Sequence, residues 1–167
     1  ALENVKKTNQ SKKRKFEIIK VDRKEFWFEK FKWFISSNGY IVICGRNIDQ
    51  NELIVKKYLN KNDLYLHSDV HGSASCVIKN KSDSIIPPYT IEQAARFVIC
   101  NSKAWNNKTP DKAWWVYPHQ VSKTAESGEY LSKGSFMIRG KKNFVKNIKL
   151  ELGLTVLFKN KGNNENI

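Results

Sequence analysis

Short runs of aromatic and β-branched residues recur along this chain of 167 residues, and turn-forming residues separate them. Runs of this kind favour β-strands of a few residues each. The stretch Ser36-Ser37-Asn38-Gly39 suits the tight turn of an antiparallel pair, because Asn and Gly tolerate positive φ. The predicted strands cover residues 26–28, 31–35, 40–44, 63–67, 75–78, 113–117, 135–139 and 150–158.

Two helices are predicted between these strands. Asp49 is a candidate N-cap for a helix that ends at Leu59. Thr90, with Gln93 three residues later, has the spacing of a capping box for a helix that ends near Trp105. Because strands outnumber helices, the predicted class is α+β, a mostly antiparallel sheet with two main helices packed on it.

The chain is predicted to divide into three parts. Residues 1–25 are polar and highly charged and are expected to form a basic helical arm, either a solvated helix that frays or the end of a longer helix. Residues 26–158 hold the predicted strands and helices and form the folded domain. Residues 159–167 are expected to be a disordered tail.

A large positive charge points to polyanionic partners. Lys and Arg number 30 against 16 Asp and Glu, which gives a formal net charge of +14. Such a charge indicates what a protein binds rather than which fold it adopts. The simpler alternative to a polyanionic partner is an ordinary lysine-rich surface exposed to solvent. An aromatic content of 12% excludes a disordered basic tail as the main feature. Side chains alternate between the two faces of a strand, so Trp114 and Trp115 are predicted to point to opposite faces. Because alternate strand residues point inward, most aromatic rings are expected in the core.

The cysteines indicate a reducing compartment. Cys44, Cys76 and Cys100 are far apart and lie in apolar runs, as expected for buried thiols, and no CxxC pair suggests zinc. The start of the chain lacks the apolar core of a signal peptide, and no apolar run is long enough to span a bilayer. A cytoplasmic protein is expected, with the nucleus as a second compartment, no membrane partner and no cofactor.

The run His67-Ser68-Asp69-Val70-His71-Gly72 has the most suggestive chemistry. Two imidazoles and a carboxylate on one strand face could bind a metal and support a metal-dependent nuclease. Alternatively, Asp69 fixes the turn, or the histidines contact phosphate or ribose, with Gly72 allowing close approach. The chain has no GxSxG, Walker or HExxH pattern, so we expect no enzyme and no bound metal.

Cations gather where predicted strands end. Gly45-Arg46-Asn47 precedes a helix, 119–123 follows the Trp-Trp strand, and Arg139-Gly140-Lys141-Lys142 closes another strand. Cations and amides at such ends can contact phosphates. The candidate RNA-contacting residues are Arg46, Lys56, Lys57, His67, His71, His119, Gln120, Lys123, Arg139, Lys141 and Lys142, with Gly45, Asp69, Gly72 and Gly140 in structural or turn positions.

Five stretches together resemble one family. They are FWFEKFKWFI at 26–35, GRNIDQNELIVKK at 45–57, LYLHSDVHGS at 64–73, DKAWWVYPHQVSK at 111–123 and GEYLSKGSFMIRGKKNF at 128–144. In this order they resemble the NFACT-R domain of the NEMF-type ribosome-quality-control factors. Two stretches depart from the expected pattern: Cys44-Gly45-Arg46-Asn47 stands where eukaryotic members are expected to have Gly-Gly-Arg-Asp, and Glu126 stands where Pro is expected.

The resemblance implies a function that composition alone does not. It implies an RNA-binding module, for tRNA or large-subunit ribosomal RNA, in a factor that acts on stalled 60S–peptidyl-tRNA complexes with a Listerin-type ubiquitin ligase. Residues 1–25 would then resemble the end of the coiled coil that precedes this domain. The alternative is a protein-interaction module that docks on the ligase or on other domains of its own factor, and a metal-dependent nuclease is the third hypothesis.

Overall fold

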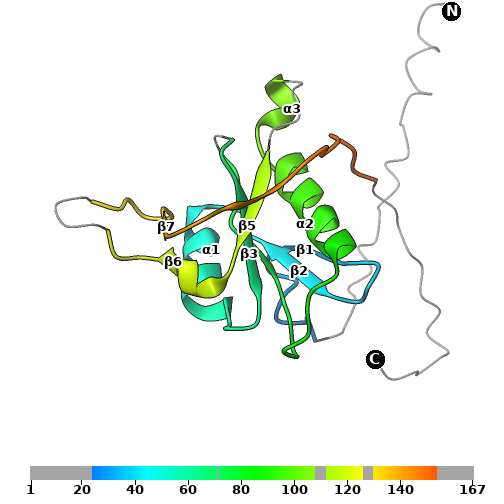
Figure 1. The fold of residues 1–167 in the computed structure, drawn as a ribbon, viewed down its shortest axis with the longest axis horizontal. Coiled ribbons are helices and arrows are strands. Elements are labelled where there is room, and N and C mark those ends of the chain that lie inside the picture. The colour runs from blue at the N-terminus through cyan, green and yellow to red at the C-terminus, as the bar shows by residue number, and fades with distance from the viewer. Residues whose placement is uncertain (1–23, 71, 108–111, 126–129, 154–167) are drawn as a thin grey trace, which may run out of the picture.

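Residues 24–70, 72–107, 112–125 and 130–153 are described by this computed structural model, and within them six strands form one antiparallel sheet (Figure 1). The sheet order is β1-β2-β4-β3-β5-β8. Its strands are β1 (Lys32–Ile35), β2 (Ile41–Cys44), β3 (Leu64–Ser68), β4 (Cys76–Ile78), β5 (Ala113–Val116) and β8 (Asn143–Val145). The short strands β6 (Val121–Ser122) and β7 (Met137–Ile138) pair separately.

Helices cover both faces of the sheet (Figure 1). The helix α1 (Ile48–Leu53) continues as one π-helical stretch, η1 (Ile54–Tyr58), and α2 (Pro88–Cys100) packs on the opposite face. A short α3 (Ala104–Asn107) and the 3₁₀ turn η2 (Pro118–Gln120) complete the helices of the described residues. The predicted α+β class is therefore confirmed. None of these described helices has the length and apolar composition needed to cross a bilayer.

Two hydrophobic cores form because consecutive strand residues point to opposite faces. Leu64 and Leu66 face the core under α2, whereas Tyr65 between them faces the core under η1. Trp114 and Trp115 divide in the same way, with Trp114 in the η1 core and Trp115 packed against the α2 core. Strands covered on both sides must be apolar at nearly every position, which explains their continuous apolar runs.

The cysteines are free and buried, as their apolar surroundings predicted. Cys44 and Cys76 are register partners on neighbouring strands under α2. Burial, together with the neighbouring Cys76, raises the pKa of the Cys44 thiol well above its usual value. A thiol with such a pKa stays protonated at neutral pH and is a poor nucleophile or metal ligand.

The first predicted strand and the first predicted cap were wrong. Residues 26–28 form a turn rather than a strand, and Phe28 packs into the η1 core. The N-cap of α1 is Asn47, whose side chain accepts a hydrogen bond from the Gln50 backbone nitrogen, so Asp49 lies in the first turn. The helix therefore begins two residues earlier than predicted, because the amide oxygen of Asn47 already caps its first turn.

The cap predicted at Thr90 was also wrong, because α2 begins at Pro88 and its N-cap is Pro87, three residues before Thr90. The buried Thr90 hydroxyl instead contacts Ser36 and Asn38, and Gln93 exchanges hydrogen bonds with Ser37. A pattern that resembles a local cap therefore joins α2 to the β1–β2 hairpin. This contact between distant segments is invisible in the local sequence.

Several C-terminal boundaries differ from the prediction. The second helix ends at Cys100 and Trp105 belongs to α3, while the strand predicted at 135–139 shortens to β7. The edge strand β8 was not predicted, and residues 150–153 form no strand. The rest of the strand predicted at 150–158, most of the arm at 1–25 and the tail at 159–167 lie outside the described residues.

One buried ion pair joins several of these elements. The carboxylate of Asp63, which is 1% exposed, accepts hydrogen bonds from the backbone nitrogens of Asn60 and Asn80. It also pairs with the ammonium group of Lys79, which in turn donates to the Tyr58 carbonyl. These contacts connect the end of η1, the start of β3 and the loop that follows β4.

We predict that Asp63→Ala lowers the free energy of unfolding by about 3–5 kcal/mol, because it leaves the Lys79 ammonium group poorly solvated and unpaired. Urea denaturation measures this change. The control is Asp49→Ala, which removes the exposed pair between Asp49 and Lys133 and should cost no more than about 1 kcal/mol. Equal losses in the two variants would contradict the structural importance of Asp63.

Candidate nucleic-acid interface

A basic segment without acidic residues contains β7 and forms the β8 edge of the sheet (Figure 1). Residues 133–150, named here the basic segment, contain no Asp or Glu, and their cations are Lys133, Arg139, Lys141, Lys142, Lys146 and Lys149. Arg139, Lys141, Lys146 and Lys149 are exposed, and their side chains make no hydrogen bond or ion pair with another described residue. These four side chains remain available for an anionic partner.

Gln120 holds the turn that carries two of these cations. Its side-chain nitrogen donates to the carbonyls of Arg139 and Lys141 at 2.9 and 3.1 Å, and the Arg139 backbone nitrogen donates to the Gln120 carbonyl. Gly140 between them has a φ of 80°, a conformation that favours glycine. The predicted site residues Gln120, Arg139, Gly140 and Lys141 therefore lie together, with Gln120 and Gly140 shaping the turn.

Lys142 is positioned by Trp114 on β5 and by Asp69, which directly follows β3. Its ammonium lies 4.3 Å from the centre of the Trp114 ring and 3.1 Å from Asp69, whose carboxylate also accepts a hydrogen bond from the Trp114 indole. Partial burial opposes ionisation of Asp69, but the hydrogen bonds from Trp114 and Lys142 and the Lys142 charge hold its pKa below the usual value. Asp69 therefore neutralises much of the Lys142 charge.

His67 lies among aromatic rings rather than at the surface. Its ring stacks on Tyr65 at 6.3 Å and lies 5.6 Å from Trp114. Burial lowers the pKa of His67, so the imidazole is neutral at physiological pH and offers no charge to phosphate. The described residues contain no group of three metal ligands, and His71, the third member of the predicted cluster, lies outside them.

Arg46 is occupied by backbone carbonyls. Its guanidinium donates to the carbonyls of Lys30 and Phe31 at 3.1 and 3.0 Å, which holds the turn before β1. At Gly45, a Cβ atom would lie 2.0 Å from the Asn51 side-chain oxygen, so this position has no room for a side chain. The predicted Gly45-Arg46 site therefore joins the start of the domain to α1, and Gly72 lies against Lys103 after β3.

The remaining predicted lysines lie near α1 and η1. Lys56 and Lys123 both pair with Glu52, and Lys57 lies 6.0 Å from the Tyr58 ring centre. His119, the last candidate, is exposed and stacks on Tyr117. The structure thus separates the predicted residues into a group at the β8 edge and a group around Glu52 that is partly neutralised.

Three exposed residues of this edge were missed by the sequence analysis. Lys146 and Lys149 extend the basic segment, and Phe144, 49% exposed, lies between them and Lys142 on β8. The sequence has no acidic residue from 133 to 150, and this pattern would have extended the predicted site to these three residues.

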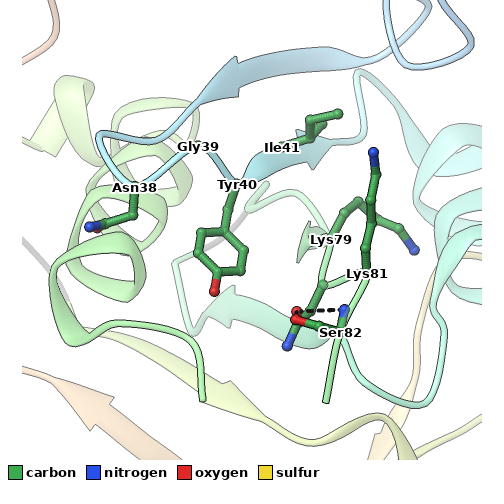
Figure 2. A pocket seen from close by; sticks show the side chains of 8 residues that line it. Asn38, Gly39, Tyr40, Ile41, Lys79, Lys81 and Ser82 are labelled. Carbon is green, nitrogen blue, oxygen red and sulfur yellow. Dashed lines mark hydrogen bonds between the residues drawn. The ribbon is translucent and has the colours of Figure 1, made fainter. Parts of the chain in front are cut away.

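Two hollows flank the loop after β4, and Asn80 lines both. The smaller, of about 260 Å³, opens beside the β1–β2 turn, and Figure 2 shows the side chains of Asn38, Tyr40 and Lys81 around it. Lys79 also lines it, but its ammonium is already paired with Asp63. The larger hollow, of about 450 Å³, lies against Trp115 and Tyr117 at the end of β5.

We predict that the fold loses stability between about pH 7.5 and pH 5.5, because the unfolded chain protonates His67 near its ordinary pKa of about 6.5 while the native imidazole stays neutral to lower pH. The loss begins as pH falls through the unfolded pKa and ends at the lower native one. In His67→Gln, urea denaturation at both pH values should show a smaller loss, whereas the exposed His119→Gln control should keep it. An unchanged loss in His67→Gln would contradict the buried neutral state.

Comparison with known proteins assigns the family. The family model described as the NFACT protein RNA binding domain matches residues 30–140. The chain is 53% identical over 156 residues to the mouse ribosome quality control complex subunit NEMF, covering 92% of this chain and 15% of the relative. It is 42% identical to the archaeal Rqc2 homolog aRqcH of Methanocaldococcus jannaschii, covering 83% of this chain and 20% of that relative.

The fold also has a solved counterpart. The C-terminal part of the fibronectin/fibrinogen-binding protein from Streptococcus suis superposes with a TM-score of 0.57 at 18% identity, over 74% of this chain and 47% of that one, which supports the fold alone. The chain thus spans only a small part of its curated relatives, 15% of the mouse protein. From the family match and these identities, the chain belongs to the NFACT protein RNA binding domain family.

Proposed function

We propose that this domain binds structured RNA through the basic segment, as one module of a longer ribosome quality control factor. The observation that carries the proposal is a set of exposed cations on an acid-free edge of the sheet, Arg139, Lys141, Lys146 and Lys149, whose side chains pair with no other residue that the structure describes. The family description and the names of the relatives support RNA and the ribosome as the setting. The RNA is tRNA or large-subunit ribosomal RNA.

Counterion release provides the driving force. Each phosphate neutralised by a lysine or arginine releases condensed ions, which makes binding fall steeply with salt. The turn held by Gln120 fixes the backbone at Arg139 and Lys141, so binding has to order only their side chains. The basic segment therefore combines charge with partial preorganisation.

The names of the relatives, which include a ribosome quality control complex subunit, support a wider setting on the ribosome. We propose that the full-length factor acts on stalled 60S–peptidyl-tRNA complexes in the cytoplasm, and that it meets a Listerin-type ubiquitin ligase through parts beyond this chain. The domain itself would contribute binding and no catalysis. Its predicted limits, residues 26–158, extend beyond the 30–140 match on both sides and remain part of the proposal.

A protein-docking role is the second candidate, and a specific surface favours it. At the β1 edge, opposite β8 in the sheet order, Phe26, Trp27 and Trp33 are 59%, 44% and 39% exposed. The Trp27 ring stacks on Tyr58 at 5.1 Å, which keeps the indole in place. Exposed aromatic groups of this kind are common at protein interfaces.

We predict that a variant with Arg139, Lys141 and Lys146 changed to Ala binds tRNA more weakly, and that the slope of log affinity against log salt becomes shallower by about two to three. Fluorescence anisotropy of the 167-residue chain across salt measures both quantities. Three cations should account for this difference in slope if each contacts one phosphate.

The matched control removes three exposed cations near the aromatic surface, in Lys24→Ala, Lys56→Ala and Lys57→Ala together. Because the net charge changes equally, a purely long-range effect would weaken the two variants alike. Equal loss in the two variants would contradict the assignment of the β8 edge, and a larger loss in the control would move the RNA contact to the α1 side.

A further inference from the structure

The 450 Å³ hollow at the end of β5 has no part in the electrostatic account above. It lies on the α2 face of the sheet, between β5, the start of β3, the loop at 83–86 and the first turn of α2. Its size suits a small organic group rather than a single ion. We asked which chemical group its walls and rim would accept.

One wall of the hollow is aromatic and continues to the surface. The rings of Trp115 and Tyr117 meet edge to face with centres 5.4 Å apart, and His119 stacks on Tyr117 at 5.8 Å with an angle of 9° between the planes. Tyr117 is 49% exposed, so one part of its ring is uncovered. A flat, exposed aromatic surface favours a flat ligand, because stacking requires parallel faces.

Further lining residues of the hollow are apolar. Ile86 and Leu64 are buried there, and Ile85 stands 92% exposed beside them. An isoleucine so exposed has almost no contacts of its own in the domain, and it could cover the second face of a flat group stacked on Tyr117. Apolar lining residues with an aromatic member are a common way to hold a planar ring system.

The rim supplies hydrogen-bonding groups that an aliphatic ligand would not use. The half-buried Asn62 side chain makes no hydrogen bond with another described residue, and the exposed Asp83 adds a carboxylate. Asn80, by contrast, is occupied by Ser82 and Ser84. An amide with a free donor and acceptor, next to a carboxylate, can pair with the mixed donors and acceptors along the edge of a nucleobase.

The hollow is joined to the basic segment by a single residue. Gln120 accepts a hydrogen bond from the Tyr117 backbone nitrogen at 3.0 Å and donates to the carbonyls of Arg139 and Lys141. The aromatic wall and the cationic turn are therefore parts of one surface. Lys61 adds a further exposed cation on the other side of the hollow.

We propose that this hollow takes one unpaired nucleobase of the bound RNA, stacked on Tyr117, while the neighbouring phosphates lie on Arg139 and Lys141. The proposal rests on the RNA binding proposed above and adds the class of RNA. The domain should prefer RNA with unpaired nucleotides over a continuous duplex, because the bases of a duplex are already stacked and paired.

The test uses fluorescence anisotropy of the 167-residue chain with two RNAs of equal phosphate number, a hairpin with an unpaired loop and a blunt duplex. We expect Tyr117→Ala to weaken hairpin binding on the order of tenfold, as for the loss of one stacked base, and to leave duplex binding unchanged. Tyr117→Phe keeps the ring and should bind as the unchanged chain does. Tyr89→Ala, which removes another exposed tyrosine, in the first turn of α2, is the matched control.

The outcomes separate the two proposals. Equal binding of the hairpin and the duplex by the unchanged chain would overturn the base site. So would a Tyr117→Ala variant that binds both RNAs normally, or that loses affinity for both equally. In either case, weaker binding by Lys141→Ala would still support RNA binding by the basic segment. Absence of binding to either RNA would overturn both proposals. If Tyr117→Ala unfolds at a lower temperature, a second measurement uses the unchanged chain and a hairpin with 2-aminopurine in its loop. Stacking on Tyr117 should quench the 2-aminopurine fluorescence, and no change in fluorescence would overturn the base site.

Discussion

The buried carboxylate of Asp63 determines where the loop after β4 can lie. It binds the backbone nitrogen of Asn80 and the ammonium of Lys79, and through Lys79 it reaches the end of η1. A buried charge of this kind is stable only with all of its partners in place, so the loop has little freedom to move. Since Asn80 lines both hollows, the walls of the proposed base site depend on this ion pair.

The two-sided core decides which parts of the sheet can meet a partner. The η1 and α2 cores cover most of both faces, so that Trp114, whose chemistry would suit RNA, is buried and His67 is half-buried. What remains is the two edges and the hollow at the end of β5. The β8 edge is cationic and the β1 edge is aromatic, and this difference makes one suited to phosphate and the other to protein.

Strand positions could be predicted well where apolar residues are continuous, as in Leu64-Tyr65-Leu66, because a strand covered on both faces leaves a clear signature. The short β8, with Asn143 in an edge position, carries no such signature and was missed. Among candidate site residues, the cationic turn at Arg139 could be identified from charge. The engagement of Arg46 by the Lys30 carbonyl depends on contacts between distant segments, which local patterns do not encode.

The most direct test of the account is an NMR titration of the ¹⁵N-labelled chain with tRNA, which reports on every backbone amide. The account predicts that the largest chemical-shift changes occur along the basic segment, 133–150, and in the adjoining residues 115–120. It also predicts little change around Trp27, Trp33 and Tyr58 at the opposite edge. Shifts concentrated at that aromatic edge, with the basic segment unchanged, would contradict the claim that β8 is the RNA-binding edge.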